Sequence, residues 1–116
     1  MTSPLYHYTC DHGFVGISKT GTVNLGDDGL VWFTDLSQPH SKVLGLDSGL
    51  DFLCSRTAYR FRADDHSTIV SWLEYQKRLP EELVWGYEMR DKAQPERWYV
   101  SDVPVKAVLA PMPVRR

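Results

Sequence analysis

The chain has 116 residues, of which 42% are hydrophobic and 24% are charged, and this composition is typical of one soluble globular domain covering residues 1–116. Its formal net charge of −2 argues against a dedicated nucleic-acid binder, which would need a basic face, although Arg56, Arg60 and Arg62 fall close together. No apolar run approaches the roughly 20 residues that span a membrane, and the first residues lack the pattern of a secretory signal. We therefore expect a cytoplasmic protein with no membrane partner.

The amino-terminal residues predict a strand followed directly by a helix. Residues 5–9, LYHYT, alternate with the two-residue period of a strand. A short helix is expected to follow, with Thr9 or Asp11 as its N-cap, and to stop near Gly21.

Three further strands are expected between residues 23 and 63. A brief one includes Val23 and Leu25, and the apolar run over 30–34, LVWFT, predicts a central strand covered on both faces. Residues 35–51 are rich in Ser, Gly, Asp and Pro and predict a loop, whose length is typical of functional loops. Residues 57–63 alternate again and predict a strand.

The carboxy-terminal half predicts one helix and two strands. Ser67 is expected to cap a helix that ends near Pro80, whereas residues 82–89 are ambiguous between helix and strand. The stretches 97–101 and 105–111 predict strands joined by a hairpin or a bend. Strands therefore outnumber helices, and the expected fold class is α+β.

The two cysteines, Cys10 and Cys54, have neither a second cysteine nor a histidine at the CxxC type of spacing. His12 is two residues after Cys10, but one such pair is a weak signal for a metal site. We expect no metal and two reduced, mostly buried thiols.

Three stretches together resemble the ADP-ribosyltransferase fold of the His-Tyr-Glu type. They are the first strand with His7, the run GLVWFT over 29–34, and PERWYV over 95–100 with Glu96 at its head. The opening is also similar to the DNA-targeting DarT-like branch and to RNA 2′-phosphotransferases. The resemblance implies a mixed, mainly antiparallel split β-sheet with two or three helices, and NAD as the cofactor.

The resemblance implies that the first strand binds the nicotinamide end of NAD. His7 would hydrogen-bond a ribose hydroxyl, which suits a neutral imidazole with one donor and one acceptor. The backbone of Tyr8 would take the nicotinamide amide, and Thr9 belongs to the same cofactor-binding stretch. The alternative is a core histidine bonded to a neighbouring carbonyl.

Trp32 stands where the family usually has a tyrosine. Its ring could still stack on nicotinamide or ribose, but the tyrosine hydroxyl is lost. Tyr59 or Tyr8 could supply that hydroxyl, so Tyr59 is also a cofactor-binding candidate. The alternative is that Trp32 is a core residue.

Glu96 is the expected catalytic carboxylate, together with His7. Cleavage of the bond between nicotinamide and ribose develops positive charge on the sugar, which a carboxylate on the ribose 2′-hydroxyl would stabilise. The same group could act as a general base toward the acceptor. Glu88 is the rival carboxylate, and the alternative for Glu96 is a surface role.

A phosphate of the dinucleotide could be held by Arg56 or Arg60, because a guanidinium matches phosphate oxygens in bidentate fashion. Arg56 is the preferred ligand, since it comes just before the strand. The alternative is an exposed arginine without such a role.

The leading interpretation is a small NAD-dependent ADP-ribosyltransferase that modifies a protein or a nucleic acid. The alternative from another class is a catalytically degenerate domain of the same fold that acts as a binding or inhibitor protein, for which four Trp and six Tyr could form the contact face. A third reading is RNA 2′-phosphotransferase chemistry, which the net charge disfavours. By resemblance, a small stand-alone chain would also fit a toxin of a phage or mobile element.

Overall fold

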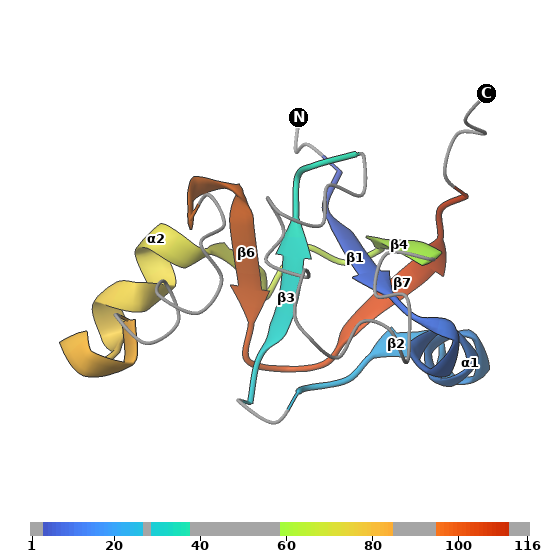
Figure 1. Cartoon of the computed structure of the whole chain (residues 1–116), viewed down its shortest axis with the longest axis horizontal. Helices are drawn as coiled ribbons and strands as arrows, with labels where there is room; N and C mark the ends of the chain where they lie inside the picture. The colour runs from blue at the N-terminus through green and yellow to red at the C-terminus, as the bar shows by residue number, and fades with distance from the viewer. Residues whose placement is uncertain (1–3, 27–28, 38–58, 85–94, 112–116) are drawn as a thin grey trace.

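The computed structural model describes residues 4–26, 29–37, 59–84 and 95–111 (Figure 1). Arg56, Cys54, Glu88 and most of the expected loop over 35–51 lie outside the described residues. The elements, in chain order, are β1 (Tyr6–Thr9), α1 (Asp11–Thr20), β2 (Thr22–Val23), β3 (Val31–Thr34), β4 (Tyr59–Ala63), β5 (Val70–Ser71), α2 (Trp72–Tyr75), the 3₁₀ turns η2 (Gln76–Arg78) and η3 (Pro95–Arg97), β6 (Trp98–Ser101) and β7 (Val105–Leu109).

All seven described strands belong to one sheet in the order β2-β7-β4-β1-β3-β6-β5, and every neighbouring pair is antiparallel. The expected α+β class with a mainly antiparallel sheet is therefore confirmed. Strands β6 and β7 do not pair with each other. The chain bends at residues 102–104 and crosses from one half of the sheet to the other (Figure 1), so of the two expected connections the bend is correct.

Strict alternation along the strands creates a core on one face of the sheet. In β4, Phe61 and Ala63 are buried while Arg62 between them is exposed, and β7 follows the same pattern from Val105 to Ala107. Helix α1 covers this face with Ile17, which packs into the buried cluster. The members of the cluster are Leu5, Ile17, Val23, Val31, Phe33, Phe61, Ala63, Val105 and Ala107.

A second, smaller core lies on the opposite face, over β3 and β6. Helix α2 supplies Trp72, which is buried against Leu30 and Val100. Partly buried side chains surround these three residues, among them Trp32 and Trp98. The two helices therefore cover different halves of the sheet from opposite sides.

The N-cap of helix α1 is one residue away from each of the two expected positions. Cys10 is the N-cap and makes no side-chain capping bond, so the prediction of Thr9 or Asp11 is wrong. The C-terminal end is as expected, because Gly21 has φ +70° and donates its N–H to the carbonyl of Ile17. Only glycine adopts this left-handed conformation without strain.

Two glycines in α1 are predicted to respond oppositely to alanine. A Cβ at Gly13 would overlap the Oγ1 atom of Thr9, whereas nothing lies within 4 Å of a Cβ at Gly16. We expect Gly13→Ala to lower the free energy of unfolding by about 1–3 kcal/mol through overpacking. Gly16→Ala should raise it by about 0.5–1 kcal/mol through helix propensity. Urea unfolding of both variants checks this, and equal effects at the two positions would contradict the contact with Thr9.

The second helix begins later than the sequence predicts. Ser67 does not cap it; its N–H instead bonds to the carboxylate of Asp65, at 2.9 Å, in a turn. Residues 70–71 then pair with β6 as β5, and Ser71 becomes the cap by accepting a hydrogen bond from the N–H of Glu74. No described helix is long and apolar enough to cross a membrane.

Candidate functional site

The three stretches singled out in the sequence lie on neighbouring strands. β3 is central, with β1 on one side and β6 on the other (Figure 1). Tyr6, Thr34 and Trp98 face one another in a row across the three strands. Between β1 and β3 the described register holds only the pair Tyr6 and Thr34, so this junction in the middle of the sheet is short.

The His7 imidazole bridges the same junction. Its Nδ1 lies 2.9 Å from the carbonyl oxygen of Trp32, and its ring meets that of Phe33 edge-on. Because a carbonyl only accepts, Nδ1 carries the proton and Nε2 is left as an acceptor. No described residue bonds to Nε2. His7 therefore has the carbonyl bond of a structural histidine and also one ring nitrogen that can accept from a ligand hydroxyl.

Burial lowers the pKa of His7 below its ordinary 6.5, and the hydrogen bond to Trp32 opposes this more weakly. Above pH 6.5 the imidazole is neutral in both the folded and the unfolded chain. As the pH falls through 6.5, the unfolded chain takes up the proton first, so the folded state loses stability, at most about 1.4 kcal/mol per pH unit.

This linkage predicts a pH-dependent loss of stability that belongs to His7. His7→Asn retains a donor for the Trp32 carbonyl but does not titrate, so its stability should fall less between pH 7.5 and pH 5 than that of the wild type. His12→Asn, at an exposed position, is the matched control and should retain the wild-type slope. Chemical unfolding at each pH measures both slopes. An identical slope in His7→Asn would contradict the assignment.

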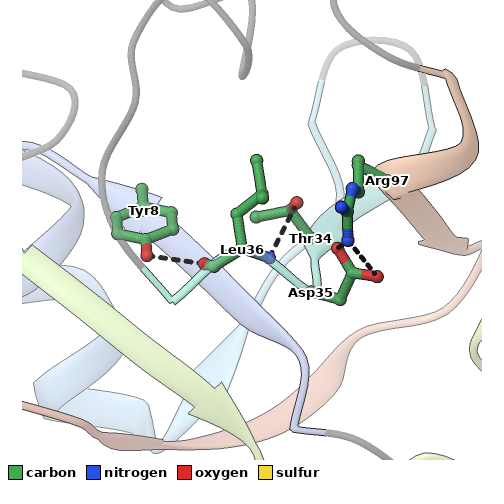
Figure 2. Close-up of polar contacts among 5 residues, drawn as sticks. All are labelled: Tyr8, Thr34, Asp35, Leu36 and Arg97. Carbon is green, nitrogen blue, oxygen red and sulfur yellow. Dashed lines mark hydrogen bonds and ion pairs between the residues drawn. The ribbon is translucent and has the colours of Figure 1, made fainter.

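The segment at the carboxyl end of β3 makes polar contacts with Tyr8 of β1 and with Arg97, which precedes β6 (Figure 2). The Tyr8 hydroxyl on β1 donates to the carbonyl of Leu36 at 2.8 Å. Arg97, directly before β6, pairs with the carboxylate of Asp35 at 3.4 Å. The Oγ1 of Thr34 accepts from the N–H of Leu36. This arrangement fixes residues 34–36 between the strand that carries His7 and the strand that Glu96 precedes.

The Trp32 ring lies on the face opposite to His7. Its ring centroid is 5.0 Å from that of Trp72 and 5.7 Å from that of Trp98. Trp32 is therefore part of the second core, which corresponds to the core alternative that the sequence left open. Tyr8 shares this face of the sheet, since it alternates with His7 along β1.

Tyr59 and Thr9 lie on the same face as His7. They face each other across β1 and β4, and the Tyr59 ring stacks on Phe14 of α1 with centroids 4.3 Å apart. Tyr8 and Tyr59 are the two candidates for the hydroxyl that Trp32 lacks, and of these Tyr8 lies on the same face of the sheet as Trp32. Burial raises the pKa of Tyr8, and Arg60 beside it opposes the rise, so the hydroxyl is protonated and can donate.

Glu96 is exposed in η3. It lies two residues before Trp98, whereas His7 lies one residue after Tyr6, and β1 and β6 run in the same direction on either side of β3. Two strand spacings separate β1 from β6, so the two Cα atoms lie at least roughly 10 Å apart. No hydrogen bond or ion pair joins the two side chains, so joint action requires a ligand such as a ribose between them.

Of the two candidate phosphate ligands, Arg60 lies within the described residues. Its Nε donates to the carbonyl of Ala110 at 3.0 Å, its Nη1 to Ser37 at 2.6 Å and its Nη2 to Pro111 at 2.9 Å. Its guanidinium carbon also lies 4.5 Å from the centre of the Tyr6 ring. Arg60 therefore ties residue 37, after β3, to the segment that follows β7.

Within the described part of the chain, neither a free thiol nor a metal-binding cluster contributes to the candidate site. Cys10 is disulfide-bonded, so the expectation of a reduced thiol is wrong for this residue. Its Sγ lies 3.8 Å from Nδ1 of His12. The described residues contain no group of three or more His, Cys, Asp or Glu side chains that could hold a metal ion.

Comparison with known proteins gives no relative from which a function could be transferred. No family model matches the chain, and neither the curated proteins nor the solved structures give a significant match.

Proposed function

We propose that the chain is a small NAD-dependent ADP-ribosyltransferase that transfers ADP-ribose to a macromolecular acceptor. The observation that carries the proposal is the strand order: the strand with His7, the strand with Trp32 and the strand preceded by Glu96 are neighbours in one sheet. A second support is the Nε2 atom of His7, which can accept a hydrogen bond from a ribose hydroxyl.

In this reaction the glycosidic bond between nicotinamide and the ribose C1′ breaks, and nicotinamide leaves with the electron pair. His7 would orient a hydroxyl of that ribose. The Glu96 carboxylate would stabilise the positive charge on the sugar and take the proton of the acceptor hydroxyl or amine as the new bond to C1′ forms. Its exposed position suits a group that must meet a macromolecule.

The second candidate is a domain that only binds a partner. Trp32 favours it, because its ring packs against Trp72 and Trp98 and is thereby engaged in the second core. A flat ring held in this way is less available for stacking on nicotinamide.

One experiment separates the two candidates. The purified chain is incubated with millimolar NAD, free nicotinamide is measured by chromatography, and thermal unfolding is recorded with and without NAD. The transferase predicts nicotinamide release in proportion to protein concentration and a higher midpoint of unfolding in NAD. Heat-unfolded protein is the control. If millimolar NAD produces no nicotinamide release and no shift of the unfolding midpoint, the transferase proposal is overturned and the binding domain remains.

A further inference from the structure

The 3₁₀ turn η3, which carries Glu96, is tied to the end of β3 by a long-range ion pair. The turn consists of three residues, lies against α2 and leads directly into β6. Nη1 of Arg97 lies 3.4 Å from one carboxylate oxygen of Asp35 and 3.5 Å from the other (Figure 2). The placement of the turn therefore depends on this ion pair as well as on β6.

A second ion pair in the described part of the chain provides a comparison. Lys77 and Glu74 are three residues apart and both are well exposed, whereas Asp35 and Arg97 are 62 residues apart in the sequence. The Asp35 side chain is 21% exposed, so salt and solvent screen it less than a fully exposed carboxylate. The pair between Asp35 and Arg97 therefore links two distant segments, while the other pair is local.

The segment at the end of β3 is itself fixed to β1. Thr34 is buried and pairs with both β1 and β6. Its Oγ1 accepts the N–H of Leu36 at 3.3 Å, and the carbonyl of Leu36 accepts the Tyr8 hydroxyl at 2.8 Å. Because Tyr8 follows His7 in β1, hydrogen bonds and the ion pair connect the strand of His7 to the turn of Glu96.

We propose that Asp35 and Arg97 are positioning residues that hold the Glu96 carboxylate at the spacing from His7 that a bound ribose requires. They act by fixing η3 and contact neither NAD nor the acceptor. A group that stabilises a transition state has to be held in place, since a displacement of about 1 Å can cost about 100-fold in rate. The inference rests on the proposed transferase function, because that function gives Glu96 its role.

The ion pair should affect the reaction rate more than the stability of the fold. The Arg97 side chain is 46% exposed, and exposed ion pairs contribute little to the free energy of unfolding. Without the pair, η3 can move locally while the sheet stays folded. We expect Asp35→Ala to lower the rate of nicotinamide release about tenfold, with a change of no more than about 3 °C in the midpoint of thermal unfolding.

The test is single-turnover release of nicotinamide by the full chain, with NAD affinity measured in parallel from the thermal shift. The affinity of Asp35→Ala should stay within about twofold of the wild type, because a positioning contact acts on the transition state. Asp35→Glu retains the carboxylate and should restore most of the rate. The matched control, Glu74→Gln, removes the carboxylate of the local ion pair and should retain the wild-type rate.

A double-mutant cycle shows whether the two residues act through their mutual contact. Arg97→Gln should lose as much rate as Asp35→Ala, and the double variant should lose no more than either single variant. Additive losses, or a loss of NAD affinity as large as the loss of rate, would overturn the positioning role.

The wild-type rate separates this inference from the proposed function. If the wild type releases nicotinamide and Asp35→Ala retains the full rate, the positioning role is wrong and the transferase function stands. If the wild type releases no nicotinamide, the transferase function and the positioning role are both wrong.

Discussion

Replacing Arg60 by methionine should lower the free energy of unfolding by about 3 kcal/mol, a larger effect than we expect for any other charged residue described. Three hydrogen bonds from one guanidinium to backbone carbonyls are lost, and hydrogen bonds of a charged group are each worth about 1.5–3 kcal/mol. The sum is reduced because the carbonyls of Ser37 and Pro111 are accessible to water. Methionine retains the hydrocarbon part of the side chain, so the measurement isolates the polar head.

The neighbouring arginine supplies the control for this prediction. Arg62 lies on the same strand and the same face but makes no hydrogen bond or ion pair in the described part of the chain. Arg62→Met should therefore change the free energy of unfolding by no more than about 0.5 kcal/mol. Arg60→Lys should be intermediate, since an ammonium group cannot reach three divergent carbonyls at once. Equal urea midpoints for Arg60→Met and Arg62→Met would contradict the role of Arg60.

The bonds of Arg60 also show why part of the fold could not be predicted from the sequence. Alternation in residues 59–63 predicted the strand and the two faces, because the period of side chains along a strand is fixed. The partners of Arg60 are backbone carbonyls, which every residue has, so no pattern of residue types indicates them. The sequence therefore placed Arg60 as a phosphate ligand candidate and not as a link between two distant segments.

Other differences have a similar origin in long-range pairing. Residues 70–71 have the composition of a helix start, but pairing with β6 makes them a strand, and the helix begins only at Trp72. The side of the sheet on which Trp32 packs depends on α2, and a tryptophan suits a core as well as a binding site. By contrast, the α+β class with an antiparallel sheet follows from the alternation within the strands and is observed.

Glu96→Gln should lower the rate of nicotinamide release at least about 100-fold, the effect expected when a charged group that stabilises the transition state is removed. The amide has nearly the same size but no negative charge, so it cannot stabilise the positive charge on the ribose or accept the acceptor's proton. Binding of NAD should remain within about threefold, because the ribose hydroxyl can still donate to the amide oxygen. Single-turnover release of nicotinamide and the thermal shift in NAD measure the two effects separately.

Two further variants decide whether the effect belongs to this carboxylate. Glu82→Gln changes an exposed residue in the helical turn over residues 81–84 and should leave the rate unchanged. Glu88→Gln tests the rival carboxylate. If Glu88→Gln loses nicotinamide release while Glu96→Gln retains the full rate, Glu88 is the catalytic carboxylate. Because β3 lies between the strand of His7 and the strand that follows Glu96, a ribose has to connect the two side chains. A Glu96→Gln, His7→Asn double variant should therefore lose more NAD affinity than Glu96→Gln alone, while its rate falls little further.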